Sequence, residues 1–210
     1  MQKFGAPVSI TLVIGKALAD LLSLFDPRPG LPDGFRYRED LLDAGEERAL
    51  VAEIARLPFK AFTFHGFFGK RRVVSFGWRY DFNEAKLREA EPIPEVFHPV
   101  REKAARFAGL DPSAFEQLLV TEYEPRAAIG WHRDRPVFGE VIGVSLLAEC
   151  TLRFRRKVGA QWRRASLALT PRSGYLLSGP ARDQWEHSIP ALEQLRYSLT
   201  FRNFRPSSSP

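Results

Sequence analysis

The segment from Trp131 to Asp134 carries an imidazole and a carboxylate two residues apart, at His132 and Asp134. On an extended strand, side chains two residues apart leave from the same face. A second histidine would complete a set of two imidazoles and one carboxylate, which holds Fe(II) and leaves coordination positions open. His187 is the only histidine after Asp134. The sequence therefore predicts an iron site formed by these three residues, in a fold that brings distant strands together.

The run RYSLTFR, from Arg196 to Arg202, follows His187 and is typical of a strand. Its two arginines are an even number of residues apart, so they share one face with Ser198 and Thr200, and the intervening apolar residues take the other face. The co-substrate of such iron oxygenases is usually 2-oxoglutarate, whose far carboxylate needs a buried cation. A guanidinium group supplies two parallel charged hydrogen bonds and stays ionised when buried. The alternative is a surface strand whose cations face solvent.

The elements that must position these residues are mainly short strands. After Phe115 the sequence alternates in short runs separated by turn residues, at 116–123, 129–134, 140–147, 150–156, 165–170, 174–178 and 196–203. A capping-box pattern at Asp43 and Glu46 predicts a helix over 44–56, and a second helix follows Pro94. We expect a mostly β fold with flanking helices, built on a double-stranded β-helix core of the jelly-roll, cupin-like type.

Composition places the chain among folded, non-membrane proteins. Of its 210 residues 44% are hydrophobic and 12% aromatic, which excludes a disordered chain. The net charge of +6 suits a polyanionic partner. The single cysteine, Cys150, cannot form an intramolecular disulfide and favours a reducing, cytoplasmic setting. Lys16 and Asp20 interrupt the apolar run from Val8 to Phe25, so we expect no membrane span. We also expect a monomer.

Proline and glycine residues are frequent from Asp26 to Gly34, a composition typical of a linker. We therefore divide the chain into an N-terminal extension and linker at 1–34, a catalytic domain at 35–205 and a short tail at 206–210.

From Tyr123 to Arg202 the chain resembles the AlkB family of Fe(II)/2-oxoglutarate-dependent dioxygenases. The resemblance is an ordered set of motifs, which are YEP from Tyr123, HRD from His132, IGVSLL from Ile142, WEH from Trp185 and RYSLTFR from Arg196. A weaker similarity extends back through Phe76 and Tyr80 to about Phe35, so it covers most of the chain.

The resemblance implies a role for each matching residue. His132, Asp134 and His187 would bind iron. Arg196 would pair with the distal carboxylate of 2-oxoglutarate, and Arg202 would approach its keto-acid end. Tyr123 would donate its hydroxyl to the co-substrate, with Thr121 beside it on the same strand face. The cofactors implied are Fe(II), 2-oxoglutarate and O2.

Two positions depart from the family pattern. Many members have asparagine where this chain has Thr121, which offers only a hydroxyl. An acidic residue that reads the base in several nucleobase-repair members would fall at Pro136, which has no side-chain hydrogen bond to offer. These departures leave the identity of the substrate open and the oxidative machinery unaffected.

We expect an oxidative demethylase that removes N-alkyl groups from nucleobases in DNA or RNA, as in DNA repair, and releases succinate, CO2 and an aldehyde. The substrate would be an alkylated single strand or a flipped-out base, because a base inside a duplex cannot reach such a pocket. Two alternatives stay open. One is the same chemistry on a protein side chain or small molecule. The other is a non-catalytic nucleic-acid-binding module.

Substrate contacts are expected from aromatic and basic residues outside the iron motifs. Trp78 and Tyr80 are candidates for a lid that stacks the base. Arg155, Arg156 and Lys157, in a basic hairpin, are candidates for phosphate contacts. A turn at 70–72 would contribute further phosphate contacts on the same side of the domain as the iron.

Overall fold

The computed structural model describes residues 30–64, 67–81, 84 and 86–205. Within the described residues one compact unit begins at Pro32. The expected extension at 1–34 and the tail at 206–210 lie almost wholly outside the described residues. No helix in the described part of the chain is long and apolar enough to cross a membrane.

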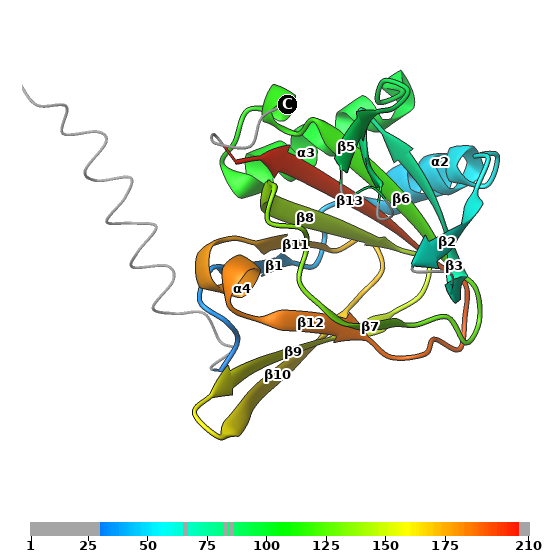
Figure 1. The fold of residues 1–210 in the computed structure, drawn as a ribbon. Coiled ribbons are helices and arrows are strands. Elements are labelled where there is room, and N and C mark those ends of the chain that lie inside the picture. Colours follow the sequence, from blue (N-terminus) through cyan, green and yellow to red (C-terminus); the bar gives the residue numbers. More distant parts are fainter. Residues whose placement is uncertain (1–29, 65–66, 82–83, 85, 206–210) are drawn as a thin grey trace, which may run out of the picture. The chain divides into compact units, whose positions relative to one another are not determined.

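Two antiparallel sheets form the core of the fold (Figure 1). The larger has the strand order β1-β11-β8-β13-β6-β3-β2 and the smaller has the order β10-β9-β12-β7. The strands of the larger sheet are β1 Phe35–Arg38, β2 Lys60–Phe64, β3 Phe67–Phe76, β6 Gln117–Tyr123, β8 Phe138–Leu146, β11 Gly174–Leu177 and β13 Arg196–Phe204. Those of the smaller sheet are β7 Ile129–His132, β9 Cys150–Val158, β10 Gln161–Leu169 and β12 Glu186–Ile189. A separate hairpin pairs β4 Trp78–Asp81 with β5 Lys86–Glu89.

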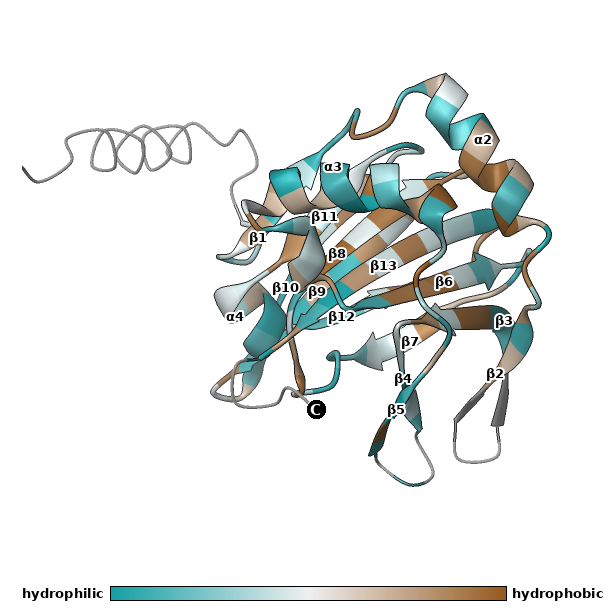
Figure 2. Cartoon of the chain, turned by 90° about the horizontal axis from the view of Figure 1, so that it is seen from above, coloured by the Kyte–Doolittle hydropathy of each residue, from teal (hydrophilic) through white to brown (hydrophobic). Residues whose placement is uncertain are grey.

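Helices pack on one face of the larger sheet, as Figure 2 shows for α2 Ala44–Ile54 and α3 His98–Ala108. A short helix, α4 Gly179–Asp183, precedes β12, and two 3-10 turns lie at Glu95–Phe97 and Pro112–Ala114. The predicted capping box is present, because the Asp43 carboxylate accepts from the Glu46 amide at 2.8 Å while Glu46 accepts from the Asp43 amide at 2.9 Å. The main hydrophobic core lies between these helices and strands β6, β8 and β13.

Strand β13 divides its side chains between the two faces of the sheet as its alternation predicted. Tyr197, Leu199 and Phe201 are buried in the core beneath the helices. Arg196 and Arg202 therefore point to the opposite side, toward the smaller sheet. Arg196 pairs in register with Tyr123 of β6, and Arg202 pairs with Gln117. The two arginines thus stand at opposite ends of the interior face.

The fold class is confirmed, but several element boundaries differ from the sequence prediction. Strand β7 ends at His132, so Asp134 lies in the connection to β8 and not on the strand. Strand β10 begins at Gln161, earlier than predicted, and β12 was not among the predicted runs. Residues 70–72 lie inside β3 and not in a turn, where Arg72 pairs with Glu122 of the neighbouring strand.

Candidate metal and co-substrate site

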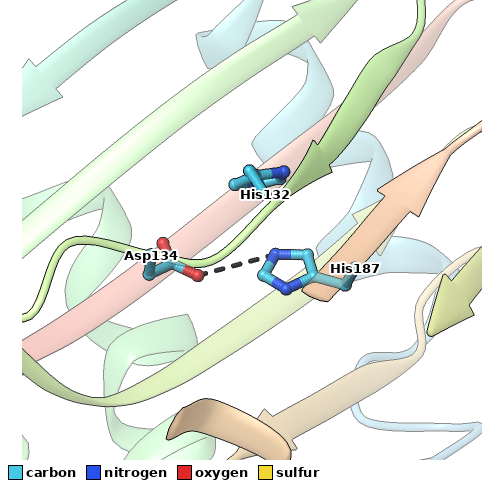
Figure 3. A group of neighbouring side chains, drawn as sticks. All are labelled: His132, Asp134 and His187. Carbon is cyan, nitrogen blue, oxygen red and sulfur yellow. Dashed lines mark ion pairs between the residues drawn. The ribbon is translucent and has the colours of Figure 1, made fainter. Parts of the chain in front are cut away.

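Three side chains from two segments of the chain converge between the two sheets (Figure 3). His132 and His187 pair in register across β7 and β12, and their ring centroids are 4.3 Å apart. Oδ2 of Asp134 lies 3.6 Å from Nε2 of His187. One ligand atom from each residue lies within 4.8 Å of those of the other two. Two imidazoles and one carboxylate at this spacing can hold one metal ion on a single face.

The protonation states of the two histidines suit metal binding. Nδ1 of His132 donates to the Gly130 carbonyl at 2.9 Å, which leaves the Nε2 lone pair free for a metal. Burial, assisted by the neighbouring His132, lowers the pKa of His187 to about 3. Burial also lowers the pKa of His132. Both rings are therefore neutral near pH 7, and neutral imidazole is the form that binds a metal.

Arg202 orients Asp134. Its Nε and Nη2 lie 2.9 and 2.7 Å from Oδ1 of Asp134, and its Nη1 donates to Gln117 at 3.0 Å. Oδ1 is thereby occupied, and Oδ2 faces His187. Burial by itself would raise the pKa of Asp134, but the charge of Arg202 and the proximity of His187 hold it well below its usual range. The carboxylate stays ionised inside the fold. The sequence resemblance had placed Arg202 near the keto acid, and its contacts here are with the metal ligand.

The connection that carries Asp134 is held from α4 by a second buried arginine. Arg182 donates from Nη2 to the carbonyls of Arg135 and Phe138, at 2.6 and 2.9 Å. It is only 5% exposed. A loop residue has no strand ladder to fix its backbone, so these two bonds supply the constraint that β7 does not.

Arg196 is a buried cation at the other end of β13. Its side chain is fully buried and its Nε donates to Oγ of Ser145 at 3.0 Å. Neither Nη1 nor Nη2 finds a hydrogen-bond partner among the described residues. A buried guanidinium with both terminal nitrogens unpaired fits a carboxylate ligand, which accepts two parallel hydrogen bonds. The residues present therefore fit both the metal and the distal carboxylate of 2-oxoglutarate.

Tyr123 and Thr121 line the same interior face of β6. The Tyr123 ring lies 5.1 Å from the Arg196 guanidinium, and its hydroxyl is hydrogen-bonded by Arg71. Thr121 pairs in register with Ser198 and is buried. Both side chains therefore lie on the interior face that also carries Arg196, and their contact with the co-substrate stays a prediction.

Sequence reasoning missed Ser145 and Tyr175 as interior residues, and it assigned Arg71 to a turn that contacts phosphate. Arg71 of β3 pairs in register with Tyr123, and burial lowers its pKa. The strand period of 71–75 could have indicated its inward direction. Ser145 lies inside the run IGVSLL, but nothing in the local sequence indicates that it contacts Arg196. Tyr175 of β11 lies so close to Gly143 that a Cβ there would stand 2.2 Å from its ring, and only the fold shows that contact.

The proposed substrate contacts are placed in different regions. The Trp78 ring meets Phe204 edge-on at 5.8 Å, and the Arg135 guanidinium lies 4.8 Å above the Tyr80 ring. Tyr80 thus contacts the residue that follows Asp134, and its role as a lid stays a prediction. Arg155 forms an ion pair with Glu186 at 2.5 Å, whereas Arg156 lies 5.2 Å from the Trp185 ring.

The basic hairpin therefore does not present its cations on one face. Arg155 pairs in register with Glu186, and Phe154 pairs with His187. Neighbouring residues of a strand point to opposite sides, so Arg155 and Lys157 point away from the metal ligands and Arg156 points to the inner side. The expectation of a single phosphate-binding surface on the side of the iron was too simple, because it ignored this alternation.

A cleft of about 570 Å³ lies elsewhere, between β1, α2 and α3. Two of the cations that line it, Lys103 and Arg172, form ion pairs with Glu46 and Glu47. None of the metal ligands and none of the proposed co-substrate or substrate residues lines it, and we assign it no part in the site.

Comparison with known proteins defines the class to which this fold and site belong. The model of the 2OG-Fe(II) oxygenase superfamily matches residues 56–202, and the chain belongs to this superfamily. The superfamily uses Fe(II), 2-oxoglutarate and O2. Within it, the AlkB-like resemblance is confirmed by two relatives from Arabidopsis thaliana. The chain is 27% identical over 194 residues to "Alkylated DNA repair protein ALKBH8 homolog" and 24% identical over 206 residues to "RNA demethylase ALKBH9B".

These alignments cover 80% and 85% of this chain but 54% and 41% of the two relatives, so the chain spans about half the length of the curated relatives it matches. Among solved structures, OsALKBH1 superimposes with a TM-score of 0.67 at 17% identity, covering 84% of this chain and 100% of that one. A Pseudomonas putida prolyl-4-hydroxylase superimposes with a TM-score of 0.57 at 16% identity, covering 90% and 99%. At these identities the superpositions show the shared fold.

Proposed function

We propose that this protein is an Fe(II)/2-oxoglutarate-dependent dioxygenase that removes N-alkyl groups from nucleobases of single-stranded or flipped-out nucleic acid. The observation that carries the proposal is the presence of two sites in the interior between the two sheets. One is the set His132, Asp134 and His187, and the other is the buried Arg196 with two unpaired terminal nitrogens. A metal and a dicarboxylate are the ligands that these two groups fit.

The residues of the chain divide the work of binding and orientation. His132 and His187 offer neutral imidazole nitrogens, and Asp134 offers Oδ2 while Arg202 holds Oδ1. Arg196 would hold the distal carboxylate of 2-oxoglutarate with two parallel hydrogen bonds. When bound, iron with 2-oxoglutarate and O2 supplies the oxidation of a substrate C–H bond, with release of succinate and CO2. The burial of Asp134, His187 and Arg196 keeps bulk water from the reacting groups.

Two observations support nucleic acid as the substrate. The curated relatives are named for alkylated DNA repair and RNA demethylation. In addition, the hairpin β4–β5 brings an aromatic ring, Tyr80, against the loop that carries Asp134. An aromatic face at the entrance of a pocket can stack an extruded base. Hydroxylation of an N-methyl carbon there would give an unstable hydroxymethyl group that leaves as formaldehyde.

Succinate and formaldehyde released by the iron-loaded protein would test the proposal. The substrates to compare are N-methylated single-stranded DNA, N-methylated single-stranded RNA, the matched unmodified strands and a methylated peptide. We expect methylated nucleic acid to raise succinate release and to yield formaldehyde in an amount equal to that increase. The unmodified strands should give only the uncoupled background of succinate. Release stimulated by the peptide alone would instead favour a protein substrate.

A further inference from the structure

The outer face of the smaller sheet gathers cations and indole rings on the side away from the metal ligands. We use "outer face" for Trp131, Arg153, Arg155, Lys157, Trp162, Arg164 and Glu186. Their membership follows from the register, in which Arg155 pairs with both Glu186 and Arg164, and Lys157 pairs with Trp162. The inward residues of the same strands, Phe154 and His187, pair with each other.

A stack of one guanidinium and two indole rings crosses this face. The Arg155 guanidinium lies 4.6 Å from the centre of the Trp131 ring and 4.5 Å from that of Trp162. Arg153 lies 5.2 Å from the Trp131 ring as well. Glu186 holds Nε of Arg155 at 2.5 Å, which fixes the plane of the guanidinium between the two indoles. Trp162 nevertheless remains 39% exposed, so part of its surface is open to a further planar group.

The charge of the outer face is strongly positive. It carries four cations, which are Arg153, Arg155, Lys157 and Arg164, against the single carboxylate of Glu186. Lys157 and Arg164 are exposed. A sheet surface that combines fixed aromatic planes with excess cations is chemically complementary to a single-stranded nucleic acid, whose bases stack on the rings while its phosphates meet the cations.

We propose that the outer face binds single-stranded nucleic acid beyond the reacting nucleotide, an inference that rests on the proposed function. Strand β7 is the edge of the smaller sheet, and it carries Trp131 outward and His132 inward. A strand that passes over this edge can therefore reach the outer face and the metal site together. Binding would hold the substrate near the pocket without reading the modified base.

Fluorescence anisotropy of the 210-residue chain with labelled, unmodified single strands of about 12 nucleotides tests this inference, because sites of this kind span roughly 4–16 nucleotides. We expect Trp162→Ala to weaken binding about tenfold and Trp162→Phe, which keeps an aromatic face, to retain most of it. Arg164→Glu should weaken binding and reduce the slope of log K against log salt by about 0.7. Arg106→Glu, an equal charge change at a 67% exposed position of α3, is the matched control and should have a much smaller effect.

Turnover of a methylated trinucleotide separates this inference from the proposed function, because so short a strand cannot occupy both regions. We expect succinate release with the trinucleotide to be the same in wild type and in the Trp162 and Arg164 variants. Wild-type affinity in both variants, or an equal loss in the Arg106 control, would overturn the outer face as the binding surface. Equally tight binding of polyglutamate would also overturn it, since only charge would then be recognised. Failure of the trinucleotide to turn over in wild type would count against the proposed function instead.

Discussion

Arg196 and Arg202 are the same residue type on the same face of β13, yet their surroundings give them different tasks. Arg202 is already paired with Asp134 and Gln117, so its charge serves the metal ligand. Arg196 is fully buried and keeps two nitrogens unpaired, so its charge is available to a ligand. A buried cation whose two terminal nitrogens lack partners is costly, and its presence is explained best by an anion that binds there.

Arg196→Lys should raise the KM for 2-oxoglutarate by roughly 10- to 100-fold, because a point charge cannot reproduce two parallel hydrogen bonds, each charged bond being worth about 1.5–3 kcal/mol. Ser145→Ala keeps the guanidinium and removes only its Nε partner, so we expect a smaller rise. Steady-state succinate release at varied 2-oxoglutarate measures both. Unchanged KM in the lysine variant would exclude Arg196 as the anchor.

The pKa of His187 gives the metal-free protein a defined pH dependence. In the unfolded chain this histidine takes up a proton near pH 6.5, whereas in the folded protein its pKa is about 3. Between these values the unfolded state binds more protons, so the free energy of unfolding falls as the pH falls, by up to about 1.4 kcal/mol per pH unit. Urea unfolding at pH 7 and pH 5 with a chelator should show a smaller fall for His187→Gln. The same fall in both proteins would contradict this origin.

At the scale of elements, the position of the third metal ligand depends on the connection between β7 and β8, because Asp134 lies in that connection and not on either strand. Strand pairing fixes His132 and His187 in register, but it ends before Asp134. The position of that carboxylate depends on contacts from other elements, namely Arg202 of β13 and Arg182 of α4. The third metal ligand is therefore the one most sensitive to distant substitutions.

Arg182→Met should weaken metal binding by about 10- to 100-fold, the range found when groups that orient a metal ligand are removed. Arg133→Met is the control, because Arg133 donates to the Asp183 carbonyl at 3.2 Å from an exposed position and should leave affinity nearly unchanged. Calorimetric titration with Mn²⁺ measures affinity without turnover. Thermal melting of both variants shows whether the fold survives, and equal affinities in two folded variants would rule out the positioning role.

At the scale of the whole molecule, the two faces of the larger sheet have different roles, because one face forms the hydrophobic core and the other carries the site residues. One of its faces packs with α2 and α3 in the main hydrophobic core, and the other face carries Arg196, Thr121, Tyr123 and Arg202. Because side chains alternate along each strand, β6 and β13 contribute to both at once. Site residues can therefore be replaced without opening the helix-side core.

The sequence predicted the parts of this arrangement that depend on local period and on residue type. Alternation along RYSLTFR gave the correct faces of β13, and the capping box gave the start of α2. The prediction that His132 and Asp134 lie close together assumed that both are on one strand face. Asp134 lies beyond the end of the strand, so that reason was wrong. Contacts of long sequence separation, such as Arg182 with the Phe138 carbonyl, have no local signature and could not be predicted.

The most direct test of the central claim is calorimetric binding of 2-oxoglutarate to the protein under anaerobic conditions, with and without Fe(II). We predict one molecule bound per chain, strong dependence on the metal, and loss of metal and 2-oxoglutarate binding together in His132→Ala, Asp134→Ala and His187→Ala. Arg196→Lys should keep the metal and lose most of the affinity for 2-oxoglutarate. Binding of 2-oxoglutarate that ignores both the metal and Arg196 would contradict the account.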